Sequence, residues 1–379
     1  MVGNCLEKEF KNMKVSVITR HAITNYGSLL QAIATQKAIE SLGHACEIIN
    51  YIRNEESYLQ LEKTLLAQKP EWNSNPIKKA IYLALRQPES VYAGRKFEKA
   101  QKQYLNLTKR YETHEQLTED KPDADVYMTG SDQVWGPTGN GTYDSSYCLS
   151  FASESDKKVA YAASFGRTNI TSEIIDYYKK WLGRYDNISV REDSAVELLN
   201  KIGIAAAKVI DPTLLLDKTF WSKYTKPIKH KNYILVYQLH NDKRVGRYAA
   251  ETAKAFGLPL IRVSASLHQI SREGKFIWCP EIGEFLSYIK NAKCMITDSF
   301  HGTAFAINFN TPFVEVLPNN GTGTRNISIL KMTGLSERIL KNDNDIELAQ
   351  KKINFSSVNE ILKKERIYSL QMLKQMIES

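Results

Sequence analysis

The order of short apolar runs and helical segments constrains this chain more than any other feature. KVSVIT at 14–19 is a β-branched run, a helical pattern follows through LLQAIATQKAIESLG, and HACEIINYI has the character of a second strand. A strand, a helix and a strand at this spacing are typical of a parallel crossover unit. Further strands are expected at 124–130, 157–166, 187–192 and 207–216. The chain is therefore predicted to have an α/β fold built on parallel sheets.

The alternation starts again after a polar stretch at 218–232, with strands expected at YILVYQL, LPLIRVS, KCMIT and TPFVEVL. Because 379 residues are many for one core, we predict two α/β domains, residues 14–217 and 218–379. A charged, helical insertion is expected around 53–120. The amphipathic helix expected at 357–378 is predicted to pack back on the N-terminal domain, with a surface-binding role as the alternative.

Composition and charge limit the classes of binding partner that can be expected. Apolar residues make up 42% of the chain, which excludes wholesale disorder. The net charge of +9 is spread along the chain and no nucleic-acid-binding motif is present, so no nucleic acid partner is expected. The positive charge fits either an anionic small substrate or a basic face near anionic lipid.

The five cysteines are far apart and form no C-x-x-C motif, so neither a disulfide framework nor a zinc site is expected. The stretch MVGNCLEKEFKN lacks an apolar segment and no apolar run reaches membrane-spanning length, so neither a secretory leader nor a membrane span is expected. We therefore expect a cytoplasmic protein. If the positive charge serves contact with anionic lipid, the protein would be peripheral to the inner face of the cell membrane.

Three polar clusters follow predicted strands: HAITNYGSLLQA, TGSDQVWGPTGNGT and TDSFHGT. Ligands bind outside the carboxyl ends of parallel strands, so these positions are where chemistry is expected. In the third cluster, Asp298 or Ser299 can cap the following helix, and the N–H groups near Phe300, His301 and Gly302 then form an anion site.

An imidazole at the start of a helix has its cationic form disfavoured by the helix dipole but stabilised by a bound anion. His301 is therefore suited to donate a proton only when substrate is present. Position alone leaves a second interpretation open, in which the cluster is a capping turn with a partly buried histidine.

The other clusters have the same two interpretations. Asn25, Tyr26 and Gly27 either shape a cleft or form only a tight turn and a cap. The loop GSDQVW either provides a sugar platform around its tryptophan or is a surface turn. Three arginines, Arg167, Arg191 and Arg325, are candidate cations for carboxylate or phosphate, or else ordinary ion-pair partners.

Taken together, the stretches NYGSLLQA, GSDQVW, YAASFG, SVRE, VIDPTLLL, TDSFHGTAFAI and RNISILKMTGL resemble the polysaccharide pyruvyl transferase family. They run from about residue 14 to about residue 340. The resemblance implies two Rossmann-like domains facing across a cleft, as in GT-B glycosyltransferases. It also implies an enzyme that uses phosphoenolpyruvate to form a pyruvate ketal on a saccharide of a capsule, exopolysaccharide or cell-wall polymer. The acceptor would be a sugar or a lipid-linked oligosaccharide, and no metal or cofactor is expected beyond phosphoenolpyruvate as co-substrate.

The resemblance carries over most directly to His301, as general acid or phosphate contact, and to Arg191, which would bind the donor's anionic groups. Asp132 is predicted as the acceptor-side base or hydroxyl anchor. The remaining donor-side residues are predicted to be Ser299, Phe300, Gly302, Arg325 and Arg167. The remaining acceptor-side residues are predicted to be Asn25, Tyr26, Gly27, Ser131, Gln133 and Trp135.

Ser299 departs from the pattern, because some members carry an arginine there that contacts phosphoenolpyruvate. Two alternatives follow. A GT-B glycosyltransferase would hold a nucleotide ribose with a carboxylate near the third cluster, where Glu315 is the nearest candidate. A saccharide-binding relative without catalysis would have kept the fold and lost the chemistry.

Overall fold

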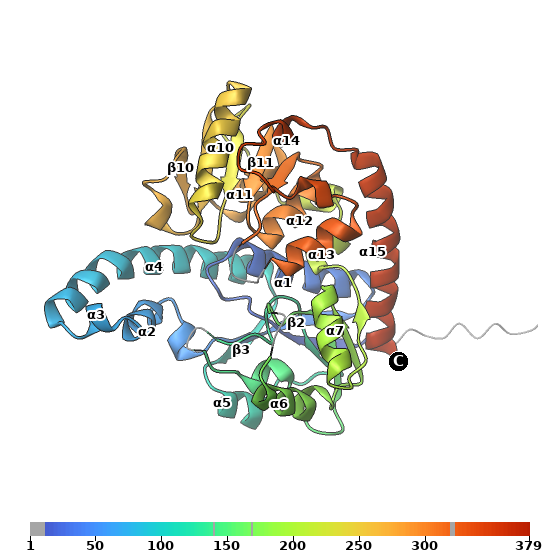
Figure 1. The fold of residues 1–379 in the computed structure, drawn as a ribbon. Coiled ribbons are helices and arrows are strands. Elements are labelled where there is room, and N and C mark those ends of the chain that lie inside the picture. Colours follow the sequence, from blue (N-terminus) through green and yellow to red (C-terminus); the bar gives the residue numbers. More distant parts are fainter. Residues whose placement is uncertain (1–11, 139–140, 168–169, 319–322) are drawn as a thin grey trace, which may run out of the picture.

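The computed structural model describes residues 12–138, 141–167, 170–318 and 323–379. It consists of two parallel β-sheets, each covered by helices, one above the other in Figure 1. The strands of the first sheet are β1 (Lys14–Ile18), β2 (Ala45–Tyr51), β3 (Leu107–Tyr111), β4 (Val126–Thr129), β5 (Lys157–Ala163), β6 (Asn187–Val190) and β7 (Ala207–Lys208). Those of the second are β8 (Ile234–Tyr237), β9 (Leu260–Ser264), β10 (Lys275–Trp278), β11 (Cys294–Thr297) and β12 (Phe313–Glu315).

The strand orders determine where a ligand can sit. The first sheet has the order β3-β2-β1-β4-β5-β6-β7 and the second β10-β9-β8-β11-β12, with every pairing parallel. In each sheet the order reverses at the first strand, between β1 and β4 and between β8 and β11. Crevices form at such reversal points, outside the carboxyl ends of the strands. The three polar clusters of the sequence follow β1, β4 and β11.

The helices fill the space between and around the sheets. The longer ones are α1 (Tyr26–Ser41), α4 (Pro76–Tyr104), α6 (Ser172–Leu182), α7 (Asp193–Lys201), α10 (Lys243–Phe256), α11 (Ile282–Lys290), α12 (Phe300–Phe309), α13 (Thr324–Met332) and α15 (Phe355–Glu378). The shorter ones are α2 (Leu61–Ala67), α3 (Pro70–Asn73), α5 (His114–Glu119), α8 (Pro212–Leu215), α9 (Lys218–Ser222) and α14 (Glu347–Gln350), with 3₁₀ turns at Asn54–Glu56, Ser145–Cys148, Leu267–Gln269 and Ser336–Arg338.

Helix α1 is buried on nearly all sides, in keeping with its apolar sequence. The Asn25 side chain caps it by accepting from the amides of Gly27 and Ser28. Gly43, with φ +89°, follows its last turn, where a left-handed residue ends a helix at low cost. The apolar core around α1 continues through α8, α11 and α12 into the second sheet, so the two α/β halves share one core.

The insertion differs from the sequence prediction in one respect. Helices α2, α3 and α4 are present, but residues 107–111 form β3, the edge strand of the first sheet. The segment LTKRY carries charged residues at two exposed positions, because an edge strand needs fewer buried side chains. The alternation was therefore too weak to identify the strand.

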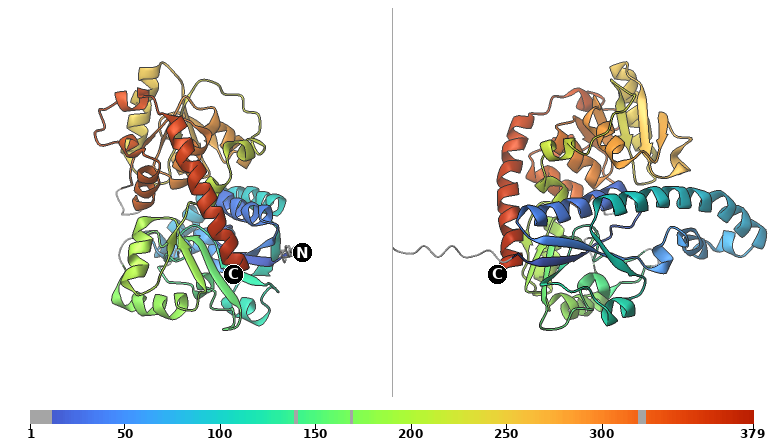
Figure 2. Two further views of the ribbon diagram at one scale, coloured as in Figure 1. Left: turned by 90° about the vertical axis from the view of Figure 1, so that its right-hand side faces the viewer. Right: turned by 180° about the vertical axis from the view of Figure 1, so that it is seen from behind.

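The last helix runs along both halves of the molecule (Figure 2). Arg366 Nε donates to the carbonyl of Leu214, and Ser369 Oγ accepts from the amide of Ile210 at 3.1 Å. Near its end, Lys157 Nζ donates to the carbonyl of Ile377 at 2.8 Å. The apolar side of α15 is thus occupied by its own chain. In the described ranges, no helix combines the length and apolar character needed to cross a bilayer.

Candidate active site

A pocket of about 400 Å³ lies between the two halves, at the carboxyl ends of β1, β4, β8 and β11. Polar side chains from both halves line it: Arg20, Asn25, Ser28, Asp132, Gln133, Arg167, His240, Asp298, Ser299, His301 and Arg325. Their convergence follows from the two reversal points facing each other. We call this pocket the cleft.

Asp132 follows β4 and has φ 77°, a left-handed conformation that costs free energy in a residue with a side chain. Its carboxylate accepts from Ser28 Oγ at 2.6 Å and pairs with Arg191 Nη2 at 3.3 Å. Burial alone would raise the pKa of Asp132, but the charges of Arg191 and other nearby groups and the hydrogen bond from Ser28 together outweigh it and hold that pKa well below its usual value. Asp132 is therefore ionised, and it is a weak base.

Arg191 follows β6, and its side chain is fully buried beneath the cleft. Nη1 donates to Asp211 Oδ2 at 2.6 Å and to Ser131 Oγ at 3.0 Å. Nε lies 3.6 Å from Glu192 Oε2. This guanidinium is thus surrounded by three carboxylates, and it does not line the cleft. The structure gives Arg191 a supporting position where direct donor contact was predicted.

Asp211 lies just before α8 and caps it by accepting from the amide of Thr213 at 2.9 Å. Although burial opposes ionisation, Arg191 lowers the pKa of Asp211. The carboxylate also lies 3.8 Å from His301 Nε2, so it connects Arg191 to the histidine. Asp211 lies in the stretch VIDPTLLL, and no role was predicted for it. An aspartate directly before Pro212 at a helix start was the available signal.

The start of α12 forms the opposite wall. Ser299 caps the helix, with Oγ accepting from the amide of Gly302 at 3.2 Å. Asp298 does not cap it, because its two oxygens accept from the amides of Leu239 and His240 at 2.7 and 2.9 Å. These bonds join the end of β8 to the end of β11. Of the two capping alternatives, the structure therefore shows Ser299.

His301 is buried and packs against the first turn of α1. A Cβ at Gly27 would come within 2.1 Å of His301 Nδ1, so only glycine leaves room for the ring. Among the residues that the structure describes, Nε2 has no hydrogen-bond partner. Burial lowers the pKa of His301 to about 4, although Asp211 opposes the shift. His301 is thus a neutral imidazole whose Nε2 makes no hydrogen bond to a described residue.

Arg325, at the start of α13, supplies a cation to the same wall. Its Cζ lies 5.9 Å from the centre of the Phe300 ring, and the Cζ of Arg191 lies 4.5 Å from it. In the part of the chain that is described, no carboxylate lies within ion-pair distance of Arg325, and its buried Nε has no partner. Burial lowers the pKa of Arg325.

Two cleft residues were not identified from the sequence. Arg20 lies two residues after β1 and is held by Glu56 at 3.7 Å and by the carbonyl of Gly136 at 3.3 Å. His240 follows β8, with Nδ1 3.3 Å from Asp298. Both lie at strand carboxyl ends, which was the signal that could have identified them.

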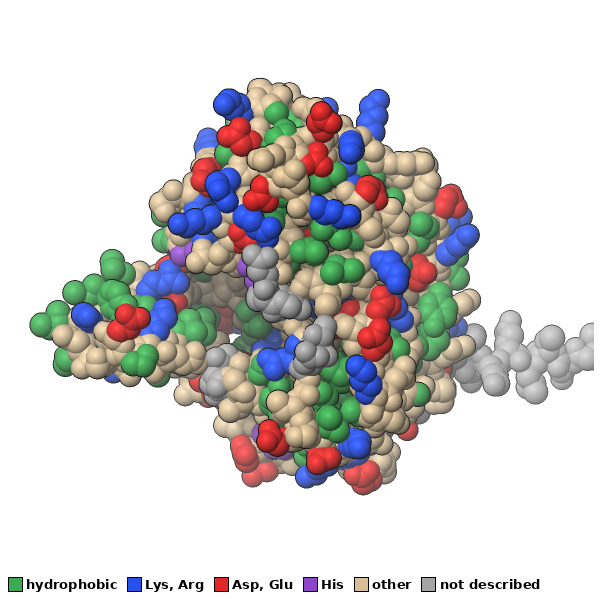
Figure 3. Space-filling model, viewed as in Figure 1, with side chains coloured by type: hydrophobic (Ala, Val, Ile, Leu, Met, Phe, Trp, Pro, Cys, Tyr) green, Lys and Arg blue, Asp and Glu red, His purple; other side chains and the backbone are tan. Residues whose placement is uncertain are grey.

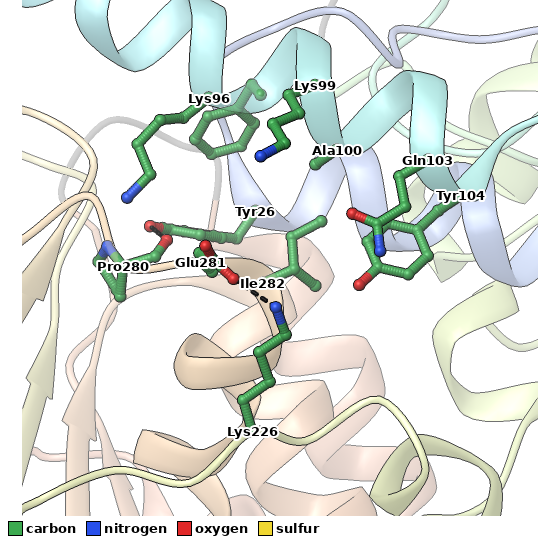
Figure 4. Close-up of a pocket in the computed structure, with 11 residues that line it drawn as sticks. Tyr26, Lys96, Lys99, Ala100, Gln103, Tyr104, Lys226, Pro280, Glu281 and Ile282 are labelled. Atoms are coloured by element: carbon green, nitrogen blue, oxygen red, sulfur yellow. Dashed lines mark hydrogen bonds and ion pairs between the residues drawn. The ribbon is translucent and has the colours of Figure 1, made fainter.

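Two aromatic residues predicted on the acceptor side lie elsewhere. Trp135 is buried against Phe165, with ring centres 5.1 Å apart, so it offers no platform to a sugar. Tyr26 stacks on Phe285 at 4.1 Å, and its hydroxyl donates to the carbonyl of Pro280. It lines a separate pocket between α4 and the start of α11, shown in Figure 4. Both rings contribute to packing, because burying such large apolar surfaces stabilises the fold.

The other predicted residues divide in the same way. Asn25, Gln133 and Arg167 line the cleft, as do Ser299 and Phe300. Ser131 is buried between Arg191 and Asp211. Gly302 packs against β8 and β11, because a Cβ there would lie 2.7 Å from Thr297 Oγ1. Its small size serves packing inside the domain, where close approach of a ligand was predicted.

No metal-ligating arrangement of three or more His, Cys, Asp or Glu side chains occurs within the described ranges. The cleft instead offers a helix N-terminus, two arginines besides Arg325, and a neutral histidine facing an ionised aspartate. Such a site can hold an anion on one wall and a hydroxyl group on the other.

Comparison with solved structures shows the fold. The chain is similar to UGT89C1 of Arabidopsis thaliana, solved in complex with UDP-L-rhamnose, with a TM-score of 0.51 at 10% identity over 97% of this chain and 100% of that chain. A putative UDP-N-acetylglucosamine 2-epimerase from Listeria monocytogenes gives a TM-score of 0.49 at 11% identity, over 94% and 91% of the two chains. The predicted GT-B-like arrangement of two Rossmann-like domains, with a C-terminal helix, is confirmed.

Comparison by sequence shows the family. No functionally curated protein matches the chain. The family model described as polysaccharide pyruvyl transferase matches residues 25–321, a range that holds every strand end of the cleft after β1. With this match and the two-domain fold, the chain belongs to the polysaccharide pyruvyl transferase family.

Proposed function

We propose that the protein transfers the enolpyruvyl group of phosphoenolpyruvate to a saccharide and closes it to a pyruvate ketal, in the synthesis of a capsular, exopolysaccharide or cell-wall polymer. The observation that supports this most is the wall formed by the start of α12, His301 and Arg325. It presents a neutral imidazole and a guanidinium without a carboxylate partner in the described structure. An anionic donor supplies a hydrogen-bond acceptor to the guanidinium and, once it is protonated, to the imidazole.

The reaction needs a proton at the methylene carbon of the donor, so that positive charge develops at the neighbouring carbon. His301 is the proposed acid. Its pKa of about 4 rises when the phosphate and carboxylate of the donor lie beside it, because a nearby anion favours the imidazolium. Donor binding is then coupled to proton uptake.

The acceptor hydroxyls supply the remaining atoms. One hydroxyl oxygen bonds to the charged carbon, the carbon–phosphate oxygen bond breaks, and a second hydroxyl closes the ketal as inorganic phosphate leaves. One of the two hydroxyl protons restores the proton that His301 gave to the methylene carbon, and the other leaves on the phosphate. The low pKa of Asp132 makes it a weak base, so we assign it to hold the acceptor hydroxyl and to stabilise the developing cation.

Arg191 has a supporting part in this proposal. It holds Asp132 and Asp211 in place, and Asp211 in turn lies near His301. In this chain Ser299 replaces the arginine of other members. The donor's anionic groups are therefore assigned to Arg325 and, from the opposite wall, to Arg20 and Arg167. No cofactor takes part.

The nucleotide-sugar alternative has little support from the second domain. Glu315, its candidate ribose ligand, is fully buried and accepts from Thr303 Oγ1 and from Asn326 Nδ2. Burial raises the pKa of Glu315 to about 8. A carboxyl group engaged in this way is not available to a ribose.

The test uses purified protein with phosphoenolpyruvate and a lipid-linked oligosaccharide from the parent cells. Release of inorganic phosphate together with a pyruvate-sized mass gain on the acceptor is expected. His301→Ala should lose at least a hundredfold in kcat, while His268→Ala, an exposed histidine of the second domain, should retain activity. Release of a nucleotide from a nucleotide sugar, or no binding of phosphoenolpyruvate by calorimetry, would overturn the proposal.

A further inference from the structure

Part of the insertion projects from the body of the protein as an arm. Helices α2, α3 and the first half of α4 form it, and they extend to one side of both domains (Figures 1 and 2). Its own side chains hold it together: Tyr82 on α4 donates to Glu62 on α2 at 3.0 Å and contacts Trp72 on α3. The arm is therefore an ordered element without a domain packed on its outer side.

The outer face of α4 is apolar. Ile77, Ile81 and Leu85 have exposed fractions of 72%, 48% and 70%, and Tyr92, 46% exposed, stacks on Trp278 of β10 with ring centres 4.4 Å apart. Spacings of four and seven residues place these side chains along one face of the helix. Apolar side chains of this size gathered on an exposed face mark an interaction surface. Figure 3 shows hydrophobic side chains covering much of this arm.

The charges on this face are positive. Arg95 and Lys99 continue the line of Ile77 and Tyr92 toward the body, and both are exposed. Lys78 is exposed beside Ile77. Together with the apolar stripe, these residues form what we call the outer face of the arm.

The carboxylates of α4 point elsewhere. Glu89 accepts from Ser266 Oγ and from the amide of Leu267 in the second domain, at 2.7 and 2.6 Å. Glu98 accepts from Tyr58 Oη at 2.7 Å. The outer face of α4 thus combines exposed apolar and basic side chains without an acidic one.

We propose that the outer face of the arm docks on an anionic membrane surface. A helix lying in the interface plane buries its apolar face among lipid tails while its lysines and arginines contact anionic headgroups. Charge complementarity favours this occupant over an ordinary protein surface, which carries both signs. Trp72, partly exposed on the arm, has the amphipathic ring that favours this interface.

The arm is connected to the cleft at its base. Glu56, in the turn that leads into the arm, pairs with Arg20 of the cleft, and Lys96 on α4 donates to the carbonyl of Cys279 in the second domain. Docking would therefore hold the cleft at a defined distance from the membrane. One consequence, which rests on the proposed function, is that a lipid-linked acceptor would be presented directly to the cleft.

The test measures sedimentation of the full-length protein with vesicles of phosphatidylcholine alone and of phosphatidylcholine with phosphatidylglycerol. Neither donor nor acceptor is present, so the result is independent of catalysis. Binding only to vesicles with phosphatidylglycerol, weakened by salt, is expected. The triple variant Ile77→Ser, Ile81→Ser, Leu85→Ser should bind at least tenfold more weakly, and Arg95→Glu with Lys99→Glu should bind several-fold more weakly.

Ile367→Ser is the matched control, since this isoleucine of α15 is 52% exposed and distant from the arm in sequence. It should bind like the parent. Equal binding by parent and triple variant, or no binding by the parent, would overturn the proposal. So would a parent dimer that the triple variant converts to monomer in sedimentation velocity, because the outer face would then belong to a second copy.

Discussion

The two walls of the cleft handle charge in opposite ways. On the wall from the first domain, Arg191 is surrounded by Asp132, Asp211 and Glu192, and the charges are largely satisfied within the protein. On the wall from the second domain, Arg325 has no carboxylate within ion-pair distance in the described structure, and His301 Nε2 lies 3.8 Å from Asp211 without a hydrogen bond to any described residue. The paired charges of the first wall hold its side chains in place, whereas the second wall can bind an anionic ligand.

This difference explains why similar residues are assigned different parts. A buried arginine enclosed by carboxylates supports geometry, since its removal leaves uncompensated charge. A buried arginine without a carboxylate carries an unfavourable desolvation that an anionic ligand relieves. Residue type alone does not separate the two cases.

Arg191→Met should have the largest effect on stability. It leaves three buried carboxylates without their cation, so the free energy of unfolding should fall by about 3–5 kcal/mol. Urea denaturation measures this. Adding Asp211→Asn should restore part of the loss, and an unchanged single variant would show that the first wall is not held by this arginine.

Arg325→Gln should separate the two walls, because it is expected to weaken donor binding without reducing the stability of the fold. The KM for phosphoenolpyruvate is expected to rise about 10–100-fold, the value of a hydrogen bond between charged groups. The midpoint of urea unfolding should stay the same or rise, because a desolvated charge is removed. Arg247→Gln, an exposed arginine on α10, is the control and should change neither. A loss of stability like that of Arg191→Met would contradict the distinction between the walls.

Gly27→Ala tests the place where the two walls touch. Its Cβ would overlap the His301 ring, so the imidazole must move and kcat should fall about tenfold or more. In a His301→Ala background the same substitution should have little further effect, because the two changes act on one contact. Steady-state phosphate release measures both, and additive losses would show that Gly27 acts in another way.

The pH dependence of stability should show the smallest effect. The folded pKa of His301, about 4, is lower than the ordinary value of 6.5. The unfolded chain therefore binds the proton first, and stability falls as pH decreases below about 6.5. When the pH falls from 7 to 5, the free energy of unfolding of the parent should therefore decrease by about 2 kcal/mol more than that of His301→Asn. Parallel curves for the two proteins would show that His301 is not buried and neutral.

Much of the cleft could be predicted from local pattern. Asp132, Ser299 and His301 each follow a strand recognisable from its apolar run, and parallel strands place their carboxyl ends at one edge. The loop tryptophan misled the prediction, because Trp135 could be exposed or buried with the same neighbours in sequence. The edge strand β3 was missed for a related reason, since its exposed side chains removed the alternation.

The sequence by itself determined the alternation of strands and helices, the family and the positions where polar groups leave the strands, since these depend on residues close together in the chain. Only the tertiary structure decided which of those groups are paired. Arg191 is enclosed because carboxylates from distant segments, such as Asp211, lie around it, and His301 is neutral because it is buried against α1 at Gly27. Desolvation and charge act through space, so the protonation and availability of each group follow from the packed structure.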